Sequence, residues 1–405
     1  MDSKANKHHN GIDKAFYKTL FKGLFSDPCT VKYWDGEEVA YGEGESRFRL
    51  ILNEPIPKAD IIADPSMAFG EAYMEKRLEI EGDIQTVIES MYRNMESFLR
   101  KGNIYNKAVK SISNNLKKSR ENVVHHYDIG NDFYRLWLDE TMTYSCGYFK
   151  SEEDTLLQAQ KNKVGHILKK LNLEEGQTLL DIGCGWGELI LEAARSYKVK
   201  VMGITLSEEQ FKAAAERAEA EGLKDLVEVR RMDYREIKDR KFDRIVSVGM
   251  AEHLGKAHLH EYFTHVGQLL NGGGLSLLHC ITGTHDSEGK GGTNSWLNKY
   301  IFPGGYVPSI QELVKYMSME GFHLIDAESL RRHYGKTLEH WSANFEKALP
   351  EIEKTRDETF IRMWRLYLKS CAASFNTGNI DLHQLVFTKG INDRIPWTRD
   401  YIYRD

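Results

Sequence analysis

Apolar and polar residues follow two different rhythms in the middle of this chain. Short apolar runs predict five strands, at Leu179–Ile182, Lys198–Ile204, Val227–Arg231, Phe242–Val248 and Leu275–Ile281. The stretches between them repeat apolar residues at helical spacing, as in Ala257–Leu270, which ends at three consecutive glycines. Strands that alternate with helices in this way predict a doubly wound, mainly parallel α/β sheet.

The pattern changes on both sides of this region. Before it, the alternating run Arg47–Leu52 and a mixed helix and turn pattern up to about Met95 predict a small α+β domain. After it, a long glycine-rich stretch from Gly283 to Gly305 is typical of a loop that covers a site. Helices then continue to about Phe375, and a final strand is predicted at Leu382–Thr388.

These changes predict the domain boundaries. We expect an N-terminal domain over residues 1–102, a linker over 103–121 and a larger domain over 122–405. The linker is rich in Lys, Asn and Ser and poor in large apolar residues.

The most informative motif begins in the first predicted strand of the sheet. The run Leu179–Gly187 reads Leu-Leu-Asp-Ile-Gly-Cys-Gly-Trp-Gly, and helical spacing resumes directly after it. Its three glycines let the backbone turn tightly and approach a ligand without interference from a Cβ atom. Because doubly wound sheets bind ligands at the carboxyl ends of their strands, the motif predicts a cradle for a nucleotide-like ligand. Its form favours S-adenosylmethionine.

Two details argue against a dinucleotide such as NAD. The dinucleotide pattern has its third glycine three positions after the second, where this chain has Glu188. The next strand ends at Thr205, without the Asp or Glu that would bind a ribose hydroxyl. One helical turn further on, Gln210 either binds the ribose or forms a capping box with Ser207, and the sequence leaves both interpretations open.

The composition is that of a soluble globular protein. The chain has 405 residues, of which 41% are hydrophobic and 28% charged, which is enough for two or three domains. No apolar run approaches the roughly 20 residues that cross a bilayer, and the first residues lack the apolar core of a secretory signal, so we expect a cytoplasmic protein. A net charge of -5 argues against general binding of nucleic acid. The five scattered cysteines predict neither a disulfide framework nor a metal site.

A short basic amphipathic helix is predicted near the N-terminus. Its apolar stripe comprises Ile12, Phe16, Leu20 and Leu24. Its basic stripe comprises Lys14, Lys18 and Lys22. Such a helix either packs against a core, which is the commoner role, or touches an anionic membrane surface.

Reactive and aromatic side chains gather near the predicted cradle. Glu252 follows the fourth strand, where an isolated acid is ordinarily an exposed loop residue. His279 lies inside the fifth strand, where a histidine is ordinarily a core residue. The segments His125–Asp139 and Met142–Phe149 are dense in aromatic rings, which suit a sulfonium or a carbocation as well as an aromatic core.

Six motifs in order resemble the cyclopropane-fatty-acyl-phospholipid synthases. They are Tyr144–Cys146, Leu180–Gly187, Gly203–Gln210, Asp243–His253, Leu278–Ile281 and Lys299–Gly305. The similarity runs from about residue 120 to 390 and, more loosely, through the N-terminal domain. That domain is typical of the bacterial members that act on phospholipids, whereas the shorter mycolic acid cyclopropane synthases lack it.

The resemblance implies a class I methyltransferase fold of seven strands, the last one antiparallel, with S-adenosylmethionine as cofactor. It implies a cofactor site made of Tyr144, Ser145, Asp181, Gly183, Gly185, Gly187, Thr205, Leu206, Ser207, Gln210 and Glu252. It also implies a bicarbonate ion as general base, held by backbone groups of Cys146 and Ile281 and by the side chains of Glu252, His279 and Tyr334. Cys371 matches a cysteine proposed as catalytic in the family; we expect a supporting role for it, because the chemistry needs no thiolate.

The implied reaction is methylene transfer to a cis double bond of an unsaturated acyl chain in a membrane phospholipid. A double bond is a weak nucleophile, so it must be aligned with the donor methyl group while water is excluded. Aromatic faces such as Tyr334 and those around Phe149 would stabilise the carbocation, and bicarbonate oriented by Glu252 would remove a proton.

The resemblance also implies partners, and two alternatives stay open beside it. The expected partners are the phospholipid, the inner face of the membrane and a second copy of the chain in a homodimer. The N-terminal domain and its basic helix are expected to make the contact with the membrane. One alternative is a methyltransferase that makes branched or hydroxylated lipids without ring closure. The other is a non-catalytic lipid-binding protein.

Overall fold

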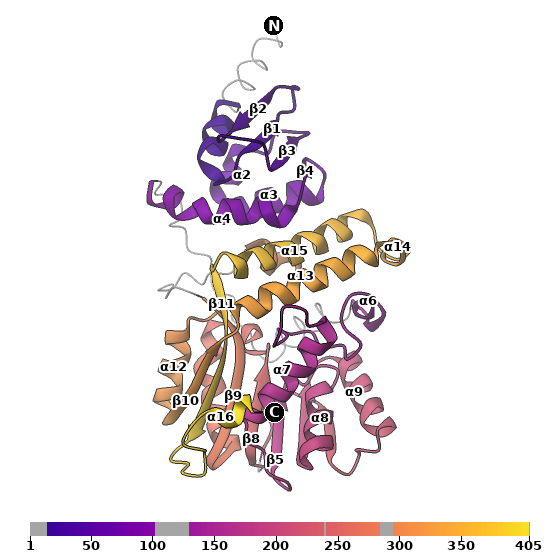
Figure 1. The fold of residues 1–405 in the computed structure, drawn as a ribbon, viewed down its shortest axis with the longest axis vertical. Helices are drawn as coiled ribbons and strands as arrows, with labels where there is room; N and C mark the ends of the chain where they lie inside the picture. Colours follow the sequence, from indigo (N-terminus) through magenta and orange to yellow (C-terminus); the bar gives the residue numbers. More distant parts are fainter. Residues whose placement is uncertain (1–13, 102–128, 239, 284–294, 405) are drawn as a thin grey trace. The chain divides into compact units, whose positions relative to one another are not determined.

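The computed structural model describes residues 14–238, except 102–128, together with 240–283 and 295–404. The side chains of 95–101 are not described. The chain folds into two compact units (Figure 1). The first contains the described residues of 1–109 together with 294–301 and 349–379, and the second contains those of 110–293, 302–348 and 380–405. The expected linker, 103–121, lies outside the described residues.

The first unit is built on a four-stranded sheet. Its strands are β1 (Cys29–Lys32), β2 (Glu38–Tyr41), β3 (Phe48–Leu52) and β4 (Leu78–Glu81), in the order β2-β1-β3-β4. Its first helices are 14–24, α2 (Lys58–Ala63), α3 (Pro65–Met74) and α4 (Ile84–Lys101). The alternation that predicted a strand at Arg47–Leu52 is confirmed, because β3 buries Phe48, Leu50 and Leu52 in the core of this unit. The predicted α+β character of the N-terminal domain is confirmed as well.

The helix over 14–24 packs against that core. Tyr17 and Phe21 are its most deeply buried side chains, so the buried stripe is shifted by one residue from the predicted one. Lys14 forms ion pairs with Asp35 and Glu37, and Lys18 pairs with Glu37 at 2.6 Å. The helix therefore has the packing role, and two of its three predicted basic residues are already paired with acids.

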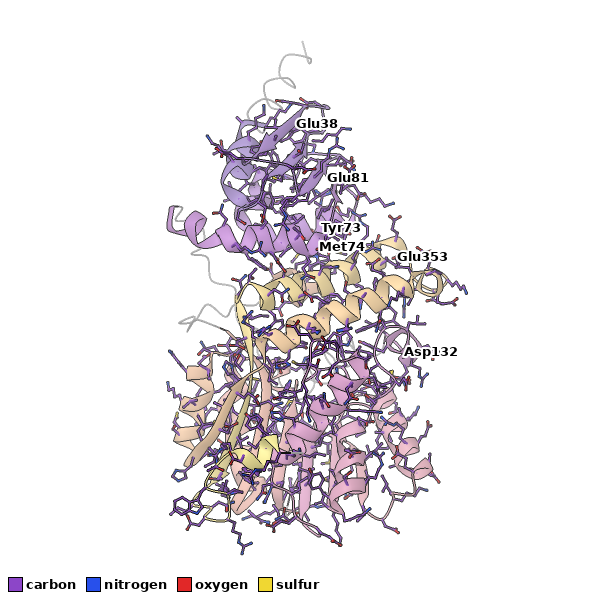
Figure 2. The ribbon with its side chains drawn as sticks, in the orientation of Figure 1. Glu38, Tyr73, Met74, Glu81, Asp132 and Glu353 are labelled. Carbon is purple, nitrogen blue, oxygen red and sulfur yellow. The ribbon has the colours of Figure 1, made fainter. Side chains whose placement is uncertain are left out.

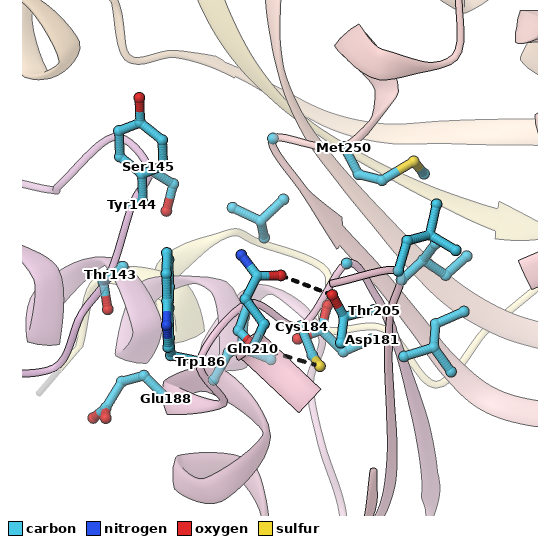
Figure 3. Close-up of a pocket in the computed structure, with 18 of the residues that line it drawn as sticks. Thr143, Tyr144, Ser145, Asp181, Cys184, Trp186, Glu188, Thr205, Gln210 and Met250 are labelled. Atoms are coloured by element: carbon cyan, nitrogen blue, oxygen red, sulfur yellow. Dashed lines mark hydrogen bonds between the residues drawn. The ribbon is translucent and has the colours of Figure 1, made fainter. Parts of the chain in front are cut away.

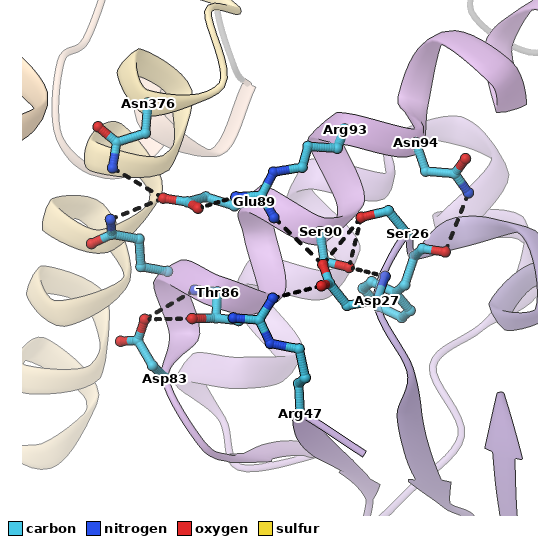
Figure 4. A network of polar contacts seen from close by, with 12 residues as sticks. Ser26, Asp27, Arg47, Asp83, Thr86, Glu89, Ser90, Arg93, Asn94 and Asn376 are labelled. Atoms are coloured by element: carbon cyan, nitrogen blue, oxygen red, sulfur yellow. Dashed lines mark hydrogen bonds and ion pairs between the residues drawn. The ribbon is translucent and has the colours of Figure 1, made fainter. Parts of the chain in front are cut away.

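Segments from much later in the chain complete the first unit. They form α11 (Ser295–Tyr300), α14 (Leu349–Ile352) and α15 (Glu358–Asn376). Trp296 lies so close to Gly70 of α3 that a Cβ at that glycine would come within 2.4 Å of the indole ring. The Nε1 of Trp296 donates to the sulfur of Met74, the last residue of α3, which Figure 2 labels. On α4, Glu89 accepts a hydrogen bond from Asn376 of α15, within a polar network that also joins α4 to Asp27 (Figure 4).

The second unit contains a seven-stranded sheet. Its strands are β5 (Thr178–Ile182), β6 (Lys200–Thr205), β7 (Val227–Arg231), β8 (Phe242–Val248), β9 (Leu270–Gly283), β10 (Phe322–Ser329) and β11 (Ile380–Lys389). Their order is β10-β11-β9-β8-β5-β6-β7, and β11 runs antiparallel to both of its neighbours. This confirms the predicted class I methyltransferase architecture, including the antiparallel last strand.

The sequence did not predict β10. This strand lies at the edge of the sheet and pairs only with β11, so much of it is exposed or half-buried. An edge strand accepts polar residues such as Asp326 and Glu328, which obscure the apolar alternation of a strand. The predicted start of the second strand was two residues early, because Lys198 ends the preceding helix in a left-handed conformation, with φ 54°.

Helices cover both faces of this sheet (Figure 1). One face carries α7 (Leu156–Lys170), α8 (Glu188–Tyr197) and α9 (Glu208–Ala220), and the other carries α10 (Leu259–Leu269) and α12 (Ile310–Met319). The remaining elements are α6 (Asn131–Arg135), α13 (Arg331–Lys347), α16 (Asp400–Tyr403) and the short turns η1 (Tyr234–Glu236), η2 (Ala251–His253) and η3 (Lys256–His258). On β9, Leu277 faces the first layer and Leu278 the second, as the alternation of a strand requires. Among the described residues, no helix is both long and apolar enough to cross a membrane.

Candidate functional site

A pocket lies in the second unit, at the carboxyl ends of β5, β6, β7 and β8 (Figure 3). It gathers most of the residues expected to bind the cofactor: Tyr144, Ser145, Asp181, Gly183, Gly185, Thr205, Leu206 and Gln210. Gly187, Ser207 and Glu252 do not line it, nor do the expected catalytic residues Cys146, His279, Ile281, Tyr334 and Cys371. The structure thus brings the glycine turn and the end of β6 together around one cavity.

The three glycines of the turn play different parts. Each has a positive φ, which is 91° at Gly183, 54° at Gly185 and 97° at Gly187. A Cβ at Gly185 would meet nothing within 4 Å, whereas one at Gly187 would lie 3.0 Å from the Cβ of Ala214 on α9. Gly187 therefore serves the close packing of α8 against α9, and this is why it matters without facing the pocket.

The end of β6 settles how Ser207 and Gln210 are bonded. The hydroxyl of Ser207 accepts from the backbone amide of Gln210 at 3.3 Å and so caps α9. The side chain of Gln210 does not complete a capping box, because its Oε1 accepts from the hydroxyl of Thr205 at 2.7 Å (Figure 3). Gln210 is thereby held against the pocket wall while Ser207 remains a cap.

Two buried charged groups line the pocket near its glycine turn. Lys163 of α7 donates from Nζ to Oγ of Ser145 at 2.8 Å, and burial lowers its pKa to about 8. Asp181, at the end of β5, is also buried, which raises its pKa to about 7, although Lys163 opposes that rise. Its Oδ1 has no hydrogen-bond partner among the described residues.

Glu252 lies just beyond β8, in the turn η2. Its Oε1 accepts a hydrogen bond from the backbone amide of Ile281 at 2.7 Å. Its Oε2 is buried and meets no hydrogen-bond partner in the described part of the chain. Burial raises the pKa of this carboxyl to about 7, although the amide of Ile281 opposes the rise. The backbone amide of Ile281, expected to hold bicarbonate, is thus bonded to Glu252 in this structure.

His279 lies on the same strand, two residues before Ile281, so both side chains point to the same face of β9. It is 1% exposed, and burial holds its pKa well below the usual value, so the ring is neutral at pH 7. Nε2 of Gln384 on β11 lies 3.1 Å from its Nδ1. With the amide as donor, the ring proton is on Nε2, which is buried and bonded to no described residue. His279 is thus a core residue that retains an unused donor.

Aromatic rings connect Tyr334 to the wall of the pocket. Tyr334 on α13 contacts Trp341 edge to face, with ring centroids 6.1 Å apart, and Trp341 lies 5.1 Å from Tyr144, which lines the pocket. Phe149, another aromatic residue expected near the carbocation, has its ring stacked on His340. The ammonium of Lys336 lies 4.9 Å from the centroid of the same ring.

The two cysteines of the expected site differ in exposure: Cys146 is buried and Cys371 is half-buried. Cys146 is 0% exposed, burial raises the pKa of its thiol, and the sulfur faces the carbonyl of Gly147 at 3.2 Å. Cys371 lies on α15 in the first unit, whereas the pocket lies in the second. Burial raises the pKa of its thiol to about 12, so at neutral pH it is a thiol and not a thiolate.

Comparison with known proteins places the chain in a family. A family model described as mycolic acid cyclopropane synthetase matches residues 114–385. A probable fatty acid methyltransferase of Pseudomonas putida is 40% identical over 384 residues, which are 93% of this chain and 96% of that protein. This chain belongs to the mycolic acid cyclopropane synthetase family. It is therefore a methyltransferase that uses S-adenosylmethionine.

Two further members of the family agree with this assignment. The cyclopropane-fatty-acyl-phospholipid synthase of Escherichia coli K12 is 41% identical over 272 residues, which are 66% of this chain and 68% of that enzyme. The crystal structure of mycolic acid cyclopropane synthase CmaA1 complexed with SAH and CTAB matches with a TM-score of 0.63 and 36% identity, over 67% of this chain and 98% of that one. A model of a domain of unknown function matches residues 16–103.

The family cofactor fits the pocket residues, because Asp181 offers an unpartnered acceptor and the glycine turn leaves room for close approach of a ligand. Sequence reasoning missed several residues of the same wall. Trp186 and Glu188 stand within or beside the glycine motif, and Asp233, Tyr234 and Arg235 follow β7. The position of Asp233 just after a predicted strand was a usable signal, whereas nothing in the sequence singled out Lys163.

Proposed function

We propose that this enzyme forms cyclopropane rings on cis-unsaturated acyl chains of membrane phospholipids, with bicarbonate as the general base. The observation that carries the proposal is that two polar atoms, on the turn η2 and on β9, are buried without a partner among the described residues. Oε2 of Glu252 is an acceptor and Nε2 of His279 is a donor, and neither meets a partner among the described residues. Unsatisfied polar atoms are costly inside a protein, so each of them favours a polar ligand as its partner.

Bicarbonate has the matching chemistry. It carries one hydroxyl donor, suited to the carboxylate of Glu252, and acceptor oxygens, suited to the N–H of His279. The amide of Ile281 holds Glu252 in place through Oε1, which leaves Oε2 for the ligand. A neutral His279 can donate to the ligand without carrying a charge of its own, and this accords with its low pKa.

Other residues of the chain align the reactants and exclude water from the site. S-adenosylmethionine, when bound, provides an electrophilic methyl group. The cluster of Trp341, Tyr144 and Trp137 packs behind the pocket wall, and Trp137 and Trp341 are fully buried. Water kept from the site cannot quench a carbocation on the lipid. Tyr334 contacts Trp341 of this cluster, and we expect its ring to stabilise such a cation.

Mass spectrometry of lipids from a host that expresses the protein tests the function. We expect monounsaturated phospholipid chains to gain the mass of one CH2 group without gaining a double bond, and their ring methylene to be visible by NMR. Purified enzyme depleted of bicarbonate should lose ring formation and regain it when bicarbonate is added back. If ring formation did not depend on bicarbonate, the proposed role of bicarbonate would be wrong, but the proposed formation of cyclopropane rings would stand.

The alternative is methyl transfer without ring closure, and it gains support from the similarity to a probable fatty acid methyltransferase. A branched, methylene-bearing or hydroxylated chain in the same lipid analysis would favour it. A shift of melting temperature on addition of S-adenosylmethionine separates both enzymes from a lipid-binding protein, which would show none.

We also propose contact with the inner face of the membrane and assembly as a homodimer. The basic helix supports membrane contact only weakly, because Lys14 and Lys18 are paired with acids and Lys22 alone is exposed without a described ion pair. Sedimentation with anionic vesicles should weaken at high salt and in the triple Lys→Glu variant. Unchanged vesicle binding and activity would exclude this helix as the contact, and light scattering would report the oligomeric state.

A further inference from the structure

Lys163 is a buried cation with an uncommon position. It is 3% exposed, it comes from the middle of α7, and it lines the cofactor pocket. Lysines on a helix ordinarily extend into water, and a buried one needs partners for its charge. Its Nζ donates a hydrogen bond to Oγ of Ser145 at 2.8 Å. It forms no ion pair within 4.0 Å among the described residues.

This bond determines what Ser145 can do. An ammonium group has only donors, so the hydroxyl oxygen of Ser145 is the acceptor. The hydroxyl proton is then available to a second acceptor, and Ser145 also lines the pocket. One turn before Lys163, Gln160 donates from Nε2 to the carbonyl of Ser145 at 2.8 Å, which fixes the backbone of the same residue. Two side chains of α7 therefore hold Ser145 with its hydroxyl ready to donate.

The pocket also contains an acidic side chain, which opposes the positive charge of Lys163. Asp181 is 2% exposed, lines the same cavity, and has an Oδ1 that no described residue bonds. It interacts electrostatically with Lys163 without forming a hydrogen bond to it. The pocket thus contains two polar groups for a ligand: the hydroxyl of Ser145, which is bonded to the ammonium of Lys163, and the Oδ1 of Asp181, unpartnered among the described residues. A zwitterion with a carboxylate and an ammonium group is the complementary ligand.

We propose that Lys163 is a positioning residue that acts through Ser145 to select the amino-acid end of the cofactor. The charge of Lys163 orients the Ser145 hydroxyl toward the α-carboxylate, while Asp181 receives the α-ammonium group. The inference rests on the proposed use of S-adenosylmethionine and deepens it, because it names the part of the ligand that the enzyme discriminates.

Calorimetric binding of two ligands tests the idea. S-adenosylhomocysteine carries the amino-acid end, and 5′-methylthioadenosine lacks it. We expect Lys163→Met to weaken binding of the first by about tenfold or more and to leave the second within about twofold. Ser145→Ala should weaken the first ligand in the same selective way, and the double variant should lose little more than either single one, because the two residues act as a unit.

Lys170 provides a matched control. It lies on the same helix, is 0% exposed and pairs with Glu328 at 2.5 Å, but it does not line the pocket. Lys170→Met should change both affinities equally or not at all. Equal weakening of both ligands by Lys163→Met, or additive losses in the double variant, would overturn the proposal. If Lys163→Met does not fold, Lys163→Gln and Ser145→Ala carry the same comparison. Failure of the wild-type protein to bind S-adenosylhomocysteine would instead reject the cofactor itself.

Discussion

Oε1 of Glu252 accepts a hydrogen bond from the backbone amide of Ile281 at 2.7 Å. This bond joins the turn after β8 to the neighbouring strand β9. It fixes one carboxylate oxygen and leaves the other, Oε2, buried and unpartnered in the described structure. The backbone amide of Ile281, and not another side chain, therefore fixes the orientation of this carboxylate. The orientation leaves Oε2 for a ligand.

Glu252→Gln should separate chemistry from binding. The glutamine can still accept from the amide of Ile281 through its own oxygen, but its NH2 group replaces the second acceptor. We expect ring formation to fall by about 100-fold or more and the affinity for S-adenosylhomocysteine to change by less than about threefold. Steady-state kinetics measures the rate of ring formation, and calorimetry measures the affinity for S-adenosylhomocysteine. Glu261→Gln, on α10 outside the pocket, is the control, and equal losses in rate and affinity would contradict the role.

The same substitution should change how stability depends on pH. The pKa of Glu252 is raised to about 7 in the folded state from 4.5. Between these values the folded protein binds more protons than the unfolded chain, so the free energy of unfolding falls as pH rises. The glutamine side chain of the variant cannot titrate. The stability of Glu252→Gln relative to wild type should therefore rise by about 2 to 3 kcal/mol from about pH 4.5 to about pH 8. Denaturant titrations at several pH values would show it, and a constant difference would refute it.

His279 should be neutral with its proton on Nε2. The Nε2 of Gln384 faces its Nδ1 at 3.1 Å, and burial keeps the pKa of the ring low. NMR of protein labelled with ¹⁵N-histidine, assigned with a His279→Gln variant, should show this tautomer from pH 8 to pH 6. Gln384→Glu places a carboxylate beside Nδ1 and should move the proton there and raise the pKa, whereas Gln384→Leu should do neither. A protonated Nδ1 in the wild type would contradict the donor role of His279.

Cys371 should be dispensable for the chemistry. Its thiol is half-buried, desolvation raises its pKa to about 12, and it belongs to the unit that does not contain the pocket. We expect Cys371→Ser to retain the turnover number within about threefold and to leave its pH profile unchanged. Cys29→Ser, which changes a buried thiol of the same unit, controls for lost stability. A loss of turnover of about 100-fold with an unchanged melting temperature would restore a catalytic role.

The sequence was most informative where a local pattern alone decides the structure. The strands Val227–Arg231 and Phe242–Val248 were predicted with the bounds that the structure has. β8 lies inside the sheet and ends in the mostly apolar and mostly buried run Ile245–Val248, whereas β7 shows the alternation of a strand at Val227 and Val229. The glycine turn was equally clear, because the positive φ angles at Gly183, Gly185 and Gly187 favour glycine whatever the surroundings. The strand β10 lacked such a signal, because polar residues such as Asp326 and Glu328 interrupt its apolar alternation.

The sequence by itself therefore determined the alternation of the central strands and helices, the cofactor class of the pocket and, through linked motifs, the family. Only the tertiary structure decided which polar groups are buried and what they bond. Lys163 shares its helix with solvent-facing lysines, and its burial depends on Ser145, 18 positions earlier in the chain. Segment 295–301 likewise joins the first unit because Trp296 fits against Gly70. A local pattern fixes which face of an element a side chain occupies, but burial and pairing depend on residues that are distant in sequence, so three-dimensional packing is needed to reveal them.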